Sequence, residues 1–231
     1  MTRTTQNLAL VRDYYTSQRA VGEETTNIYE IWENGGAFND SVTPSTYVPQ
    51  YRSHMADKLL SLTRDGATVF SLGCGNAAVE GVLVGENRKV RAIDVNQEAV
   101  ELARRKGVDA FTADYFTLSP EDVGDVDLVY ADGFLGHLFD ADEHLGRALG
   151  KLTGFGLGSG AHLVFSNDAP QDPTVDFAPH ERVADFWFIA KDYLQERLVD
   201  HGFAPVESYY VSYDRPLSGP RNRTVCVVRV P

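Results

Sequence analysis

The sequence predicts an α/β fold, a three-layer sandwich whose mostly parallel seven-stranded sheet ends in an antiparallel hairpin. From residue 67 onward, short apolar runs alternate with amphipathic segments, which is typical of strands joined by helices in a parallel sheet. The last two apolar runs, 206–213 and 223–230, are joined by a turn without a helix, and strands joined directly are antiparallel. We expect residues 1–64 to form a helical cap packed on the core, and residues 65–231 to form the main domain of a single structural unit.

Helical periodicity characterises the residues before the sheet. Leu8, Val11 and Tyr15 recur on one face of a first helix, and a shorter aromatic segment follows at 29–32. Apolar residues at steps of three and four then predict an amphipathic helix over 45–62. We expect these three segments to make up the cap.

Several capping signals place the elements of the main domain. After the first strand and its two glycines, the segment 76–84 is compatible with a helix. Asn96 as a cap and Gly107 after three basic residues predict a second helix. Asp140 and Glu143 resemble a capping box and predict the start of another helix. The remaining elements are expected as strands at 90–94, 108–111, 126–131 and 161–166, a brief helix at 119–122, a loop at 168–180 and a long helix at 183–198.

Composition and charge narrow the class of protein. The chain has 231 residues and a formal net charge of −12, which would repel phosphate backbones, so we expect no nucleic-acid substrate. No apolar run approaches the roughly 20 residues that span a bilayer, and the N-terminus lacks the apolar core of a signal peptide. Cys74 and Cys226 stand in apolar contexts without His or Cys neighbours, so we expect a cytoplasmic protein without a metal site. The sequence leaves a homodimer open.

An abrupt glycine turn is the most informative local feature. The apolar run 69–72 stops at Gly73 and Gly75, which suit a tight turn where the backbone adopts positive φ and a ligand approaches closely. A second apolar run ends in Asp94, 21 residues after Gly73. A carboxylate at the tip of that strand can accept hydrogen bonds from both hydroxyls of a ribose. The pair predicts a cofactor that contains a nucleoside.

Four motifs in order resemble those of the class I S-adenosylmethionine-dependent methyltransferases: the glycine motif at 72–77, the acidic residue Asp94, the segment 112–115, and the segment 127–133 with its continuation to 138. The resemblance covers roughly residues 65–231 and implies S-adenosyl-L-methionine as the cofactor and a small-molecule methyl acceptor. The residues that it implies in cofactor binding are Ser71, Gly73, Gly75, Asp94, Val95, Asp114, Tyr115 and Ala131.

Two positions of the glycine motif depart from the family pattern. Ser71 stands where an acidic residue is common, so that Glu80 or Asp132 becomes a candidate for the missing hydrogen-bond acceptor. Ala77 stands where a third glycine is common, and alanine is tolerated there if its φ is negative. The amino-acid end of the cofactor is therefore expected to be held differently in this chain.

The segment after the fourth strand carries the candidate catalytic residues. Asp132 lies where the methyl group is expected and is a candidate to bind an acceptor amine, and His137 is a candidate proton acceptor. A solvated carboxylate and a histidine bonded to a backbone carbonyl are the structural alternatives. Candidate walls of the substrate pocket, each of which also suits a place in the core or in a solvated loop, are Tyr29, Trp32, His180 and Tyr209.

The function predicted from these residues is methyl transfer from S-adenosylmethionine to a small molecule, and we favour an amine nitrogen as the acceptor. Transfer to a hydroxyl with His137 as the base is the nearest alternative. A non-catalytic cofactor-binding protein stays open because of Ser71. A nicotinamide-dependent oxidoreductase is disfavoured because the third glycine of its fingerprint would fall at Ala78.

Overall fold

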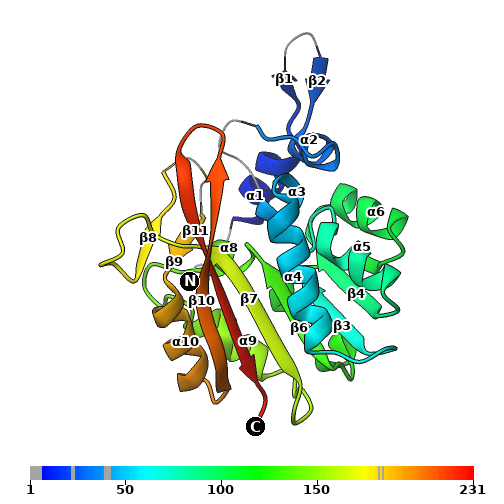
Figure 1. Cartoon of the computed structure of the whole chain (residues 1–231), viewed down its shortest axis with the longest axis vertical. Coiled ribbons are helices and arrows are strands. Elements are labelled where there is room, and N and C mark those ends of the chain that lie inside the picture. Colours follow the sequence, from blue (N-terminus) through cyan, green and yellow to red (C-terminus); the bar gives the residue numbers. More distant parts are fainter. Residues whose placement is uncertain (1–6, 22–23, 39–42, 182, 184) are drawn as a thin grey trace.

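The computed structural model describes residues 7–21, 24–38, 43–181, 183 and 185–231. A seven-stranded sheet with the order β10-β11-β7-β6-β3-β4-β5 forms its centre (Figure 1). Its first five strands along the chain are parallel, and β11 pairs antiparallel with both β7 and β10. This arrangement confirms the predicted fold class. The strands are β3 (Thr68–Leu72), β4 (Lys89–Asp94), β5 (Asp109–Thr112), β6 (Leu128–Asp132), β7 (His162–Asp168), β10 (Ala204–Arg215) and β11 (Gly219–Arg229).

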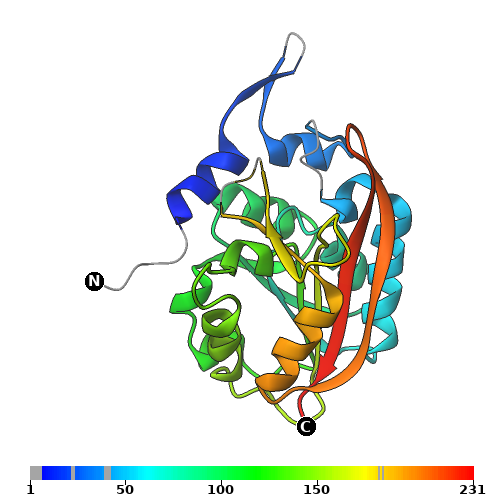
Figure 2. The same ribbon diagram turned by 90° about the vertical axis from the view of Figure 1, so that its left-hand side faces the viewer.

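Two apolar cores, one on each face of the sheet, make the sandwich three-layered. Along β6, Leu128 and Tyr130 belong to one core, whereas Val129 and Ala131 belong to the other, as the alternation of a strand requires. In Figure 2, α4 and α10 lie on opposite sides of the β10–β11 hairpin. The helices of the two layers are α4 (Pro49–Ser61), α5 (Ala78–Gly85) and α6 (Gln97–Arg105) on one face, and α7 (Pro120–Val123), α9 (Gly146–Thr153) and α10 (Lys191–Asp200) on the other.

The segments before α4 cover the end of the sheet at which β3, β4 and β6 finish. Ile28, Tyr29 and Trp32 of α2 pack against α6 in a third apolar cluster. Asn27 caps α2 in a complete capping box with Glu30. In Figures 1 and 2 the β1–β2 hairpin projects beyond the body of the molecule. The elements of this region are α1 (Leu8–Thr16), β1 (Arg19–Val21), β2 (Glu24–Thr26), α2 (Ile28–Glu33) and α3 (Pro44–Tyr47).

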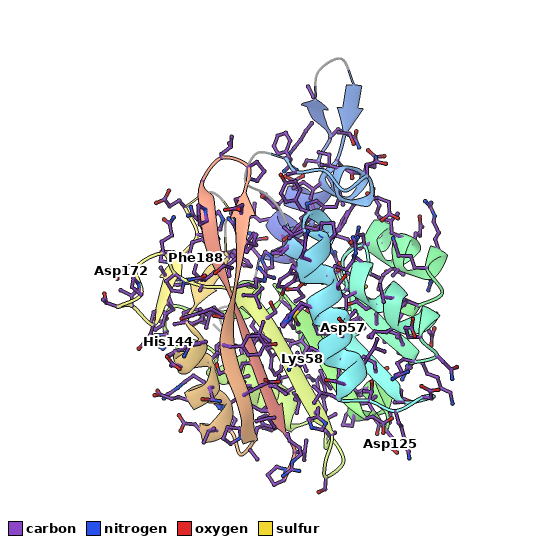
Figure 3. The ribbon with its side chains drawn as sticks, viewed as in Figure 1. Asp57, Lys58, Asp125, His144, Asp172 and Phe188 are labelled. Carbon is purple, nitrogen blue, oxygen red and sulfur yellow. The ribbon has the colours of Figure 1, made fainter. Side chains whose placement is uncertain are left out.

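The helix expected over 45–62 is divided in the structure into α3 and α4. Val48 separates the two with φ −113° and ψ 99°, because a residue that precedes proline disfavours the helical conformation, and Pro49 starts α4. The side chains of α4, including the labelled Lys58, lie over the sheet in Figure 3. Lys58 pairs with Glu207 of β10 at 2.7 Å. This helix, expected in the cap, therefore belongs to one layer of the sandwich.

Two further expectations on helices are wrong. The predicted helix 183–198 begins only at Lys191, because β9 (Trp187–Ile189) pairs with β8 (Phe177–Pro179) in a small antiparallel sheet. Trp187 stacks on Phe139, so the apolar spacing that suggested a helix serves contacts between aromatic rings. The predicted capping box at Asp140 instead closes a turn, since Asp140 accepts from the amides of Asp142 and Glu143, and α9 begins at Gly146.

Ala77 shows a fourth difference from the expectation. Its φ is +55°, in the left-handed region, and it precedes α5 as the N-terminal cap residue. An alanine in this conformation costs about 1–2 kcal/mol, so the turn that starts α5 is held against local strain. Among the described residues, no helix has the length and the apolar character needed to span a membrane.

Candidate active site

A cavity lies at the carboxyl ends of β3, β4, β6 and β7, where the chain reverses its direction of strand addition on either side of β3. Such a switch in strand order is where open α/β sheets bind ligands. The cavity encloses about 1240 Å³ of unfilled space, part of it open to solvent. The residues predicted from the sequence that line it are Tyr29, Trp32, Gly73, Gly75, Asp94, Val95, Tyr115, Asp132, His137 and His180.

The glycine turn and Asp94 are bonded to each other. Gly73 and Gly75 have φ of +68° and +52°, and a side chain at Gly73 would meet the ring of Phe134 at 2.6 Å. The amide of Gly75 donates to Oδ2 of Asp94 at 3.0 Å, and the amide of Asn96 donates to Oδ1 at 2.9 Å. Burial raises the pKa of Asp94 above its usual value, although these amides oppose the rise. Each carboxylate oxygen keeps a lone pair for a ligand.

Ser71 and Glu80 form a buried pair beside the turn. The hydroxyl of Ser71 donates to Oε1 of Glu80 at 2.6 Å. Glu80 comes from the first turn of α5 and lines the cavity, whereas Ser71 lies behind it and does not. Burial raises the pKa of Glu80 to about 7, and the bond from Ser71 opposes that rise.

Three other predicted cofactor residues lie in or under the wall of the cavity. Asp114 caps a short 3₁₀ helix, η1 (Tyr115–Thr117), through the amide of Phe116 at 3.0 Å and does not line the cavity. Tyr115 lines the cavity, but its hydroxyl donates into the core, to the carbonyl of Ala148 at 2.8 Å. Ala131 is buried in the core beneath the cavity and does not line it.

A buried charge network closes the other end of the cavity. Arg223 on β11 bonds Asp132 at the tip of β6 and pairs with Asp168 at the end of β7 at 3.1 Å. Arg215 also pairs with Asp168, and the hydroxyl of Tyr213 donates to it at 2.6 Å. Burial by itself would raise the pKa of Asp168, but the two guanidinium groups outweigh it and lower that pKa. The sequence analysis missed Arg223, because nothing local links it to Asp132, 91 residues away.

Three polar atoms of residues in the cavity wall are buried without a hydrogen-bond partner in the part of the chain that the structure describes. They are Oδ2 of Asp132, the hydroxyl of Tyr130 and Nδ1 of His137. The other oxygen of Asp132 is bonded to Arg223 and accepts from the hydroxyl of Tyr51 at 3.3 Å. Because an unpaired buried polar atom costs about 1–3 kcal/mol, such atoms indicate the positions of polar groups of a ligand.

His137 connects the site to the N-terminal segments. It lies in α8 (Leu135–Leu138), and its Nε2 is 2.9 Å from the hydroxyl of Tyr15. Burial lowers the pKa of His137 to about 4, so the ring is neutral at pH 7. Tyr15 stacks on Tyr29 with a centroid distance of 5.6 Å and contacts Trp32 edge-on. These rings form an aromatic wall over the cavity.

The last two predicted substrate residues lie in different places. His180 lines the cavity from β8–β9, and its Nδ1 accepts from the amide of Val183 at 3.1 Å. Tyr209 does not line the cavity: its hydroxyl is bonded to Nε2 of His54 on α4 at 2.9 Å. Tyr213, four residues further along the same face of β10, is the tyrosine that reaches the charge network. Tyr213 bonds a residue of the cavity wall but, like Tyr209, does not itself line the cavity.

Comparisons with known proteins decide the family. A family model described as a methyltransferase domain matches residues 70–153. The tabtoxin biosynthesis enzyme of Pseudomonas amygdali pv. tabaci is 55% identical over 231 residues, which make up 100% of this chain and 92% of that protein. The chain belongs to the class I S-adenosylmethionine-dependent methyltransferases. Both the enzyme class and the cofactor predicted from the sequence are thereby confirmed.

Solved structures share the fold of this methyltransferase. The magnesium protoporphyrin IX methyltransferase of Synechocystis PCC 6803 with bound S-adenosylhomocysteine matches with a TM-score of 0.64 at 18% identity, over 97% of this chain and 100% of that chain. The 1,6-didemethyltoxoflavin-N1-methyltransferase of Burkholderia thailandensis matches with a TM-score of 0.59 at 22% identity, over 78% of this chain and 77% of that chain. At these identities the likeness is one of fold.

The cavity of this methyltransferase fits S-adenosylmethionine. The space above Gly75 is open, with no heavy atom within 4 Å of an added Cβ, and Asp94 offers two oxygens beside it for the ribose hydroxyls. When bound, the cofactor supplies a methyl group already activated on a sulfonium, so the chain contributes by positioning and by excluding water, and such positioning is worth up to about 7–11 kcal/mol. The aromatic wall of Tyr15, Tyr29 and Trp32 covers the cavity from the side of the cap.

Proposed function

We propose that this methyltransferase transfers the methyl group to an amine nitrogen of a small molecule, and that Asp132 binds the amine. The observation that carries this proposal is the unpartnered Oδ2 of Asp132, which lines the cavity at the tip of β6. Arg223 and Tyr51 bond the other oxygen and so fix the direction of the carboxylate. Oδ2 of Asp132 needs a hydrogen-bond donor, and the N–H of an amine is one. When that N–H points at Asp132, the nitrogen lone pair points away from the carboxylate and is free to face the methyl group.

The protonation states of the cavity support nitrogen over oxygen. A hydroxyl acceptor needs a base to remove its proton, but burial lowers the pKa of His137 to about 4. Burial also raises the pKa values of Tyr15 and Tyr130, so neither is an anion at neutral pH. An amine acceptor needs only to bind in its neutral form. The neutral fraction of the amine in solution increases as the pH approaches the amine pKa of about 10.4. We therefore propose that His137 does not act as a base and instead positions Tyr15 through the bond between its Nε2 and the Tyr15 hydroxyl.

The close relative suggests the setting of the reaction. Because a protein 55% identical over the whole chain is a tabtoxin biosynthesis enzyme, we propose that this chain methylates an intermediate of tabtoxin or of a related small molecule. A net charge of −12 favours such an acceptor over a nucleic acid. A homodimer stays a prediction.

The test combines an acceptor panel with one variant. Purified enzyme is incubated with methyl-labelled S-adenosylmethionine and pairs of small molecules that differ only in an amine or a hydroxyl, and the labelled atom is located by NMR. We expect the label on nitrogen, and we expect kcat/KM to rise with pH toward the pKa of the amine. A label on oxygen contradicts the proposal.

Asp132→Asn isolates the role of the carboxylate. The amide keeps an oxygen for Arg223 but loses the charge that faces the amine, so turnover should fall about 10- to 100-fold while the affinity for S-adenosylhomocysteine stays within about threefold. Asp142→Asn, in the exposed turn that follows, is the matched control and should change neither quantity.

A further inference from the structure

We propose that Glu80 is the carboxylate that binds the α-ammonium group of the cofactor, and that it does so from helix α5 in place of an acidic residue at position 71. The proposal concerns the amino-acid end of S-adenosylmethionine and goes beyond the proposed function, because it holds for an oxygen or a nitrogen acceptor alike.

The first observation is that Glu80 is a buried carboxylate with no ion-pair partner among the described residues. Its exposed fraction is 4%, and it lines the cavity. Lys106, whose charge lowers the pKa of Glu80, bonds both carboxylate oxygens of Glu33 on α2 instead. A buried carboxylate costs several kcal/mol unless a cation compensates it. A ligand with a positive charge in the cavity provides that compensation.

The second observation is the orientation that Ser71 imposes. The Ser71 hydroxyl donates a hydrogen bond to Oε1 of Glu80 at 2.6 Å, and Ser71 itself does not line the cavity. An acidic side chain at 71 would place two carboxylates in hydrogen-bond contact in the core. The serine therefore serves as a support that fixes one oxygen of Glu80 and leaves the other to a ligand.

The third observation is the orphaned hydroxyl of Tyr130. It lines the same cavity, is buried, and has no hydrogen-bond partner among the residues described. Glu80 lines the same cavity, and its charge adds to the rise that burial causes in the pKa of Tyr130. A carboxylate and an unpaired hydroxyl together match the zwitterionic amino-acid group of the cofactor, which brings an ammonium donor and a carboxylate acceptor.

Calorimetry with two ligands tests the proposal. S-Adenosylhomocysteine carries the α-ammonium, whereas 5′-deoxy-5′-methylthioadenosine carries the nucleoside and sulfur without the amino-acid group. Glu80→Gln should weaken the binding of S-adenosylhomocysteine about 10- to 100-fold and change that of methylthioadenosine by less than about twofold. Equal losses for both ligands, or no loss for either, overturn the proposal.

The reciprocal exchange keeps the test decisive if the single variant is poorly folded. Ser71→Asp combined with Glu80→Ser exchanges the two side-chain types, so that the carboxylate stands at position 71 and the hydroxyl at position 80. It should recover the affinity for S-adenosylhomocysteine to within about fivefold of the wild type. Ser71→Asp alone, with two adjacent carboxylates, should be the least stable of the set. Failure of the double variant to bind better than Glu80→Gln overturns the proposal.

The melting temperature without ligand distinguishes a binding role of Glu80 from a structural one. A binding role predicts that Glu80→Gln raises it, whereas a structural role predicts that the variant lowers it. Because the pKa of Glu80 is raised to about 7 by burial, its ionisation destabilises the ligand-free fold as the pH rises above its unfolded value of about 4.3. Glu80→Gln should therefore melt higher than the wild type at pH 8 in the absence of ligand. The affinity of the wild type for S-adenosylhomocysteine should rise between pH 6 and pH 8, and the variant should lose that rise.

The charged and titratable groups around Glu80 leave this pH dependence to Glu80 itself. Asp132 on β6 raises its pKa, and Lys106 after α6 and Ser71 on β3 lower it. Cys74 and Tyr130 have pKa values well above their usual ranges, so both are neutral over this interval. A melting temperature that falls in Glu80→Gln, together with equal losses for both ligands, would identify the residue as purely structural.

Discussion

The two ends of the cavity are built in different ways. At the end proposed to bind the cofactor, Gly73, Gly75 and Asp94 come from the adjacent strands β3 and β4, and backbone amides join them. At the end proposed to bind the acceptor, Asp132, Asp168 and Arg223 come from β6, β7 and β11, and charged side chains join them. The first end depends on the conformation of a short stretch of chain, whereas the second depends on strands that meet only in the folded sheet.

This difference has consequences for stability as well as for binding. A carboxylate bonded to amides needs no counter-charge, so the cofactor end can lose its acidic residue and keep its fold. The acceptor end holds two buried carboxylates that Arg223 compensates together. Removing one member there leaves uncompensated charge in the core. Substitutions at the two ends should therefore separate binding from stability.

The largest effect is expected for Arg223→Met. This change keeps the length of the side chain but leaves Asp132 and Asp168 without their shared cation, and a broken buried pair costs about 3–5 kcal/mol. The melting temperature at pH 7 should fall by roughly 6–20 °C, as measured by calorimetry or circular dichroism. Arg229→Met, on an exposed position of the same strand, should change it by less than about 2 °C.

The pH dependence of the same variant sharpens this prediction. In the wild type the pKa of Asp168 is lowered, so its contribution to stability is present above the unfolded value of about 3.9 and is lost as the pH falls through the folded value. Without Arg223 the carboxylate of Asp168 becomes easier to protonate. The difference in melting temperature between the wild type and Arg223→Met should consequently be smaller at pH 4.5 than at pH 7. A difference that stays constant would contradict the charge argument.

A smaller effect on stability and a large one on binding are expected for Asp94→Ala. Loss of two charge-assisted bonds to the ribose should lower the affinity for S-adenosylhomocysteine about 100-fold or more, as measured by calorimetry. The amides of Gly75 and Asn96 lose their acceptor, which should cost about 1–3 kcal/mol of stability. Glu101→Ala, exposed on α6, is the control. Retained affinity in the Asp94 variant would remove it from the cofactor site.

The smallest effect is expected for Tyr209→Phe. Its hydroxyl bonds His54 on the face covered by α4, away from both ends of the cavity. The loss should be about 0.5–1.5 kcal/mol of stability, with KM for the acceptor unchanged. Tyr213→Phe is the informative partner, because its hydroxyl bonds Asp168, and this variant should lower turnover. A change in the KM for the acceptor in Tyr209→Phe would indicate that Tyr209 contributes to the substrate pocket after all.

The strands of the sheet are the part of the fold on which the sequence and the structure agree best. Apolar runs located all seven strands, and the two glycines and the distant aspartate that predicted a cofactor site lie in the wall of one cavity. One error arose where tertiary contacts prevailed over a periodic pattern. Phe186 and Trp187 have helical spacing from Val183, yet Phe186 packs on His137 and Trp187 on Phe139, so the segment leads into a strand.

The sequence by itself determined the fold class and the family, because these follow from strand periodicity, turn chemistry and short-range spacing. Only the tertiary structure decided the neighbours of Asp132, the pairing of Ser71 with Glu80, and which tyrosine of β10 bonds Asp168. Arg223 and Asp132 are brought together by the order of strands in the sheet, and although burial alone would lower the pKa of Arg223, Asp132 and Asp168 outweigh it and raise that pKa. Neither property is encoded in the residues on either side of them along the chain.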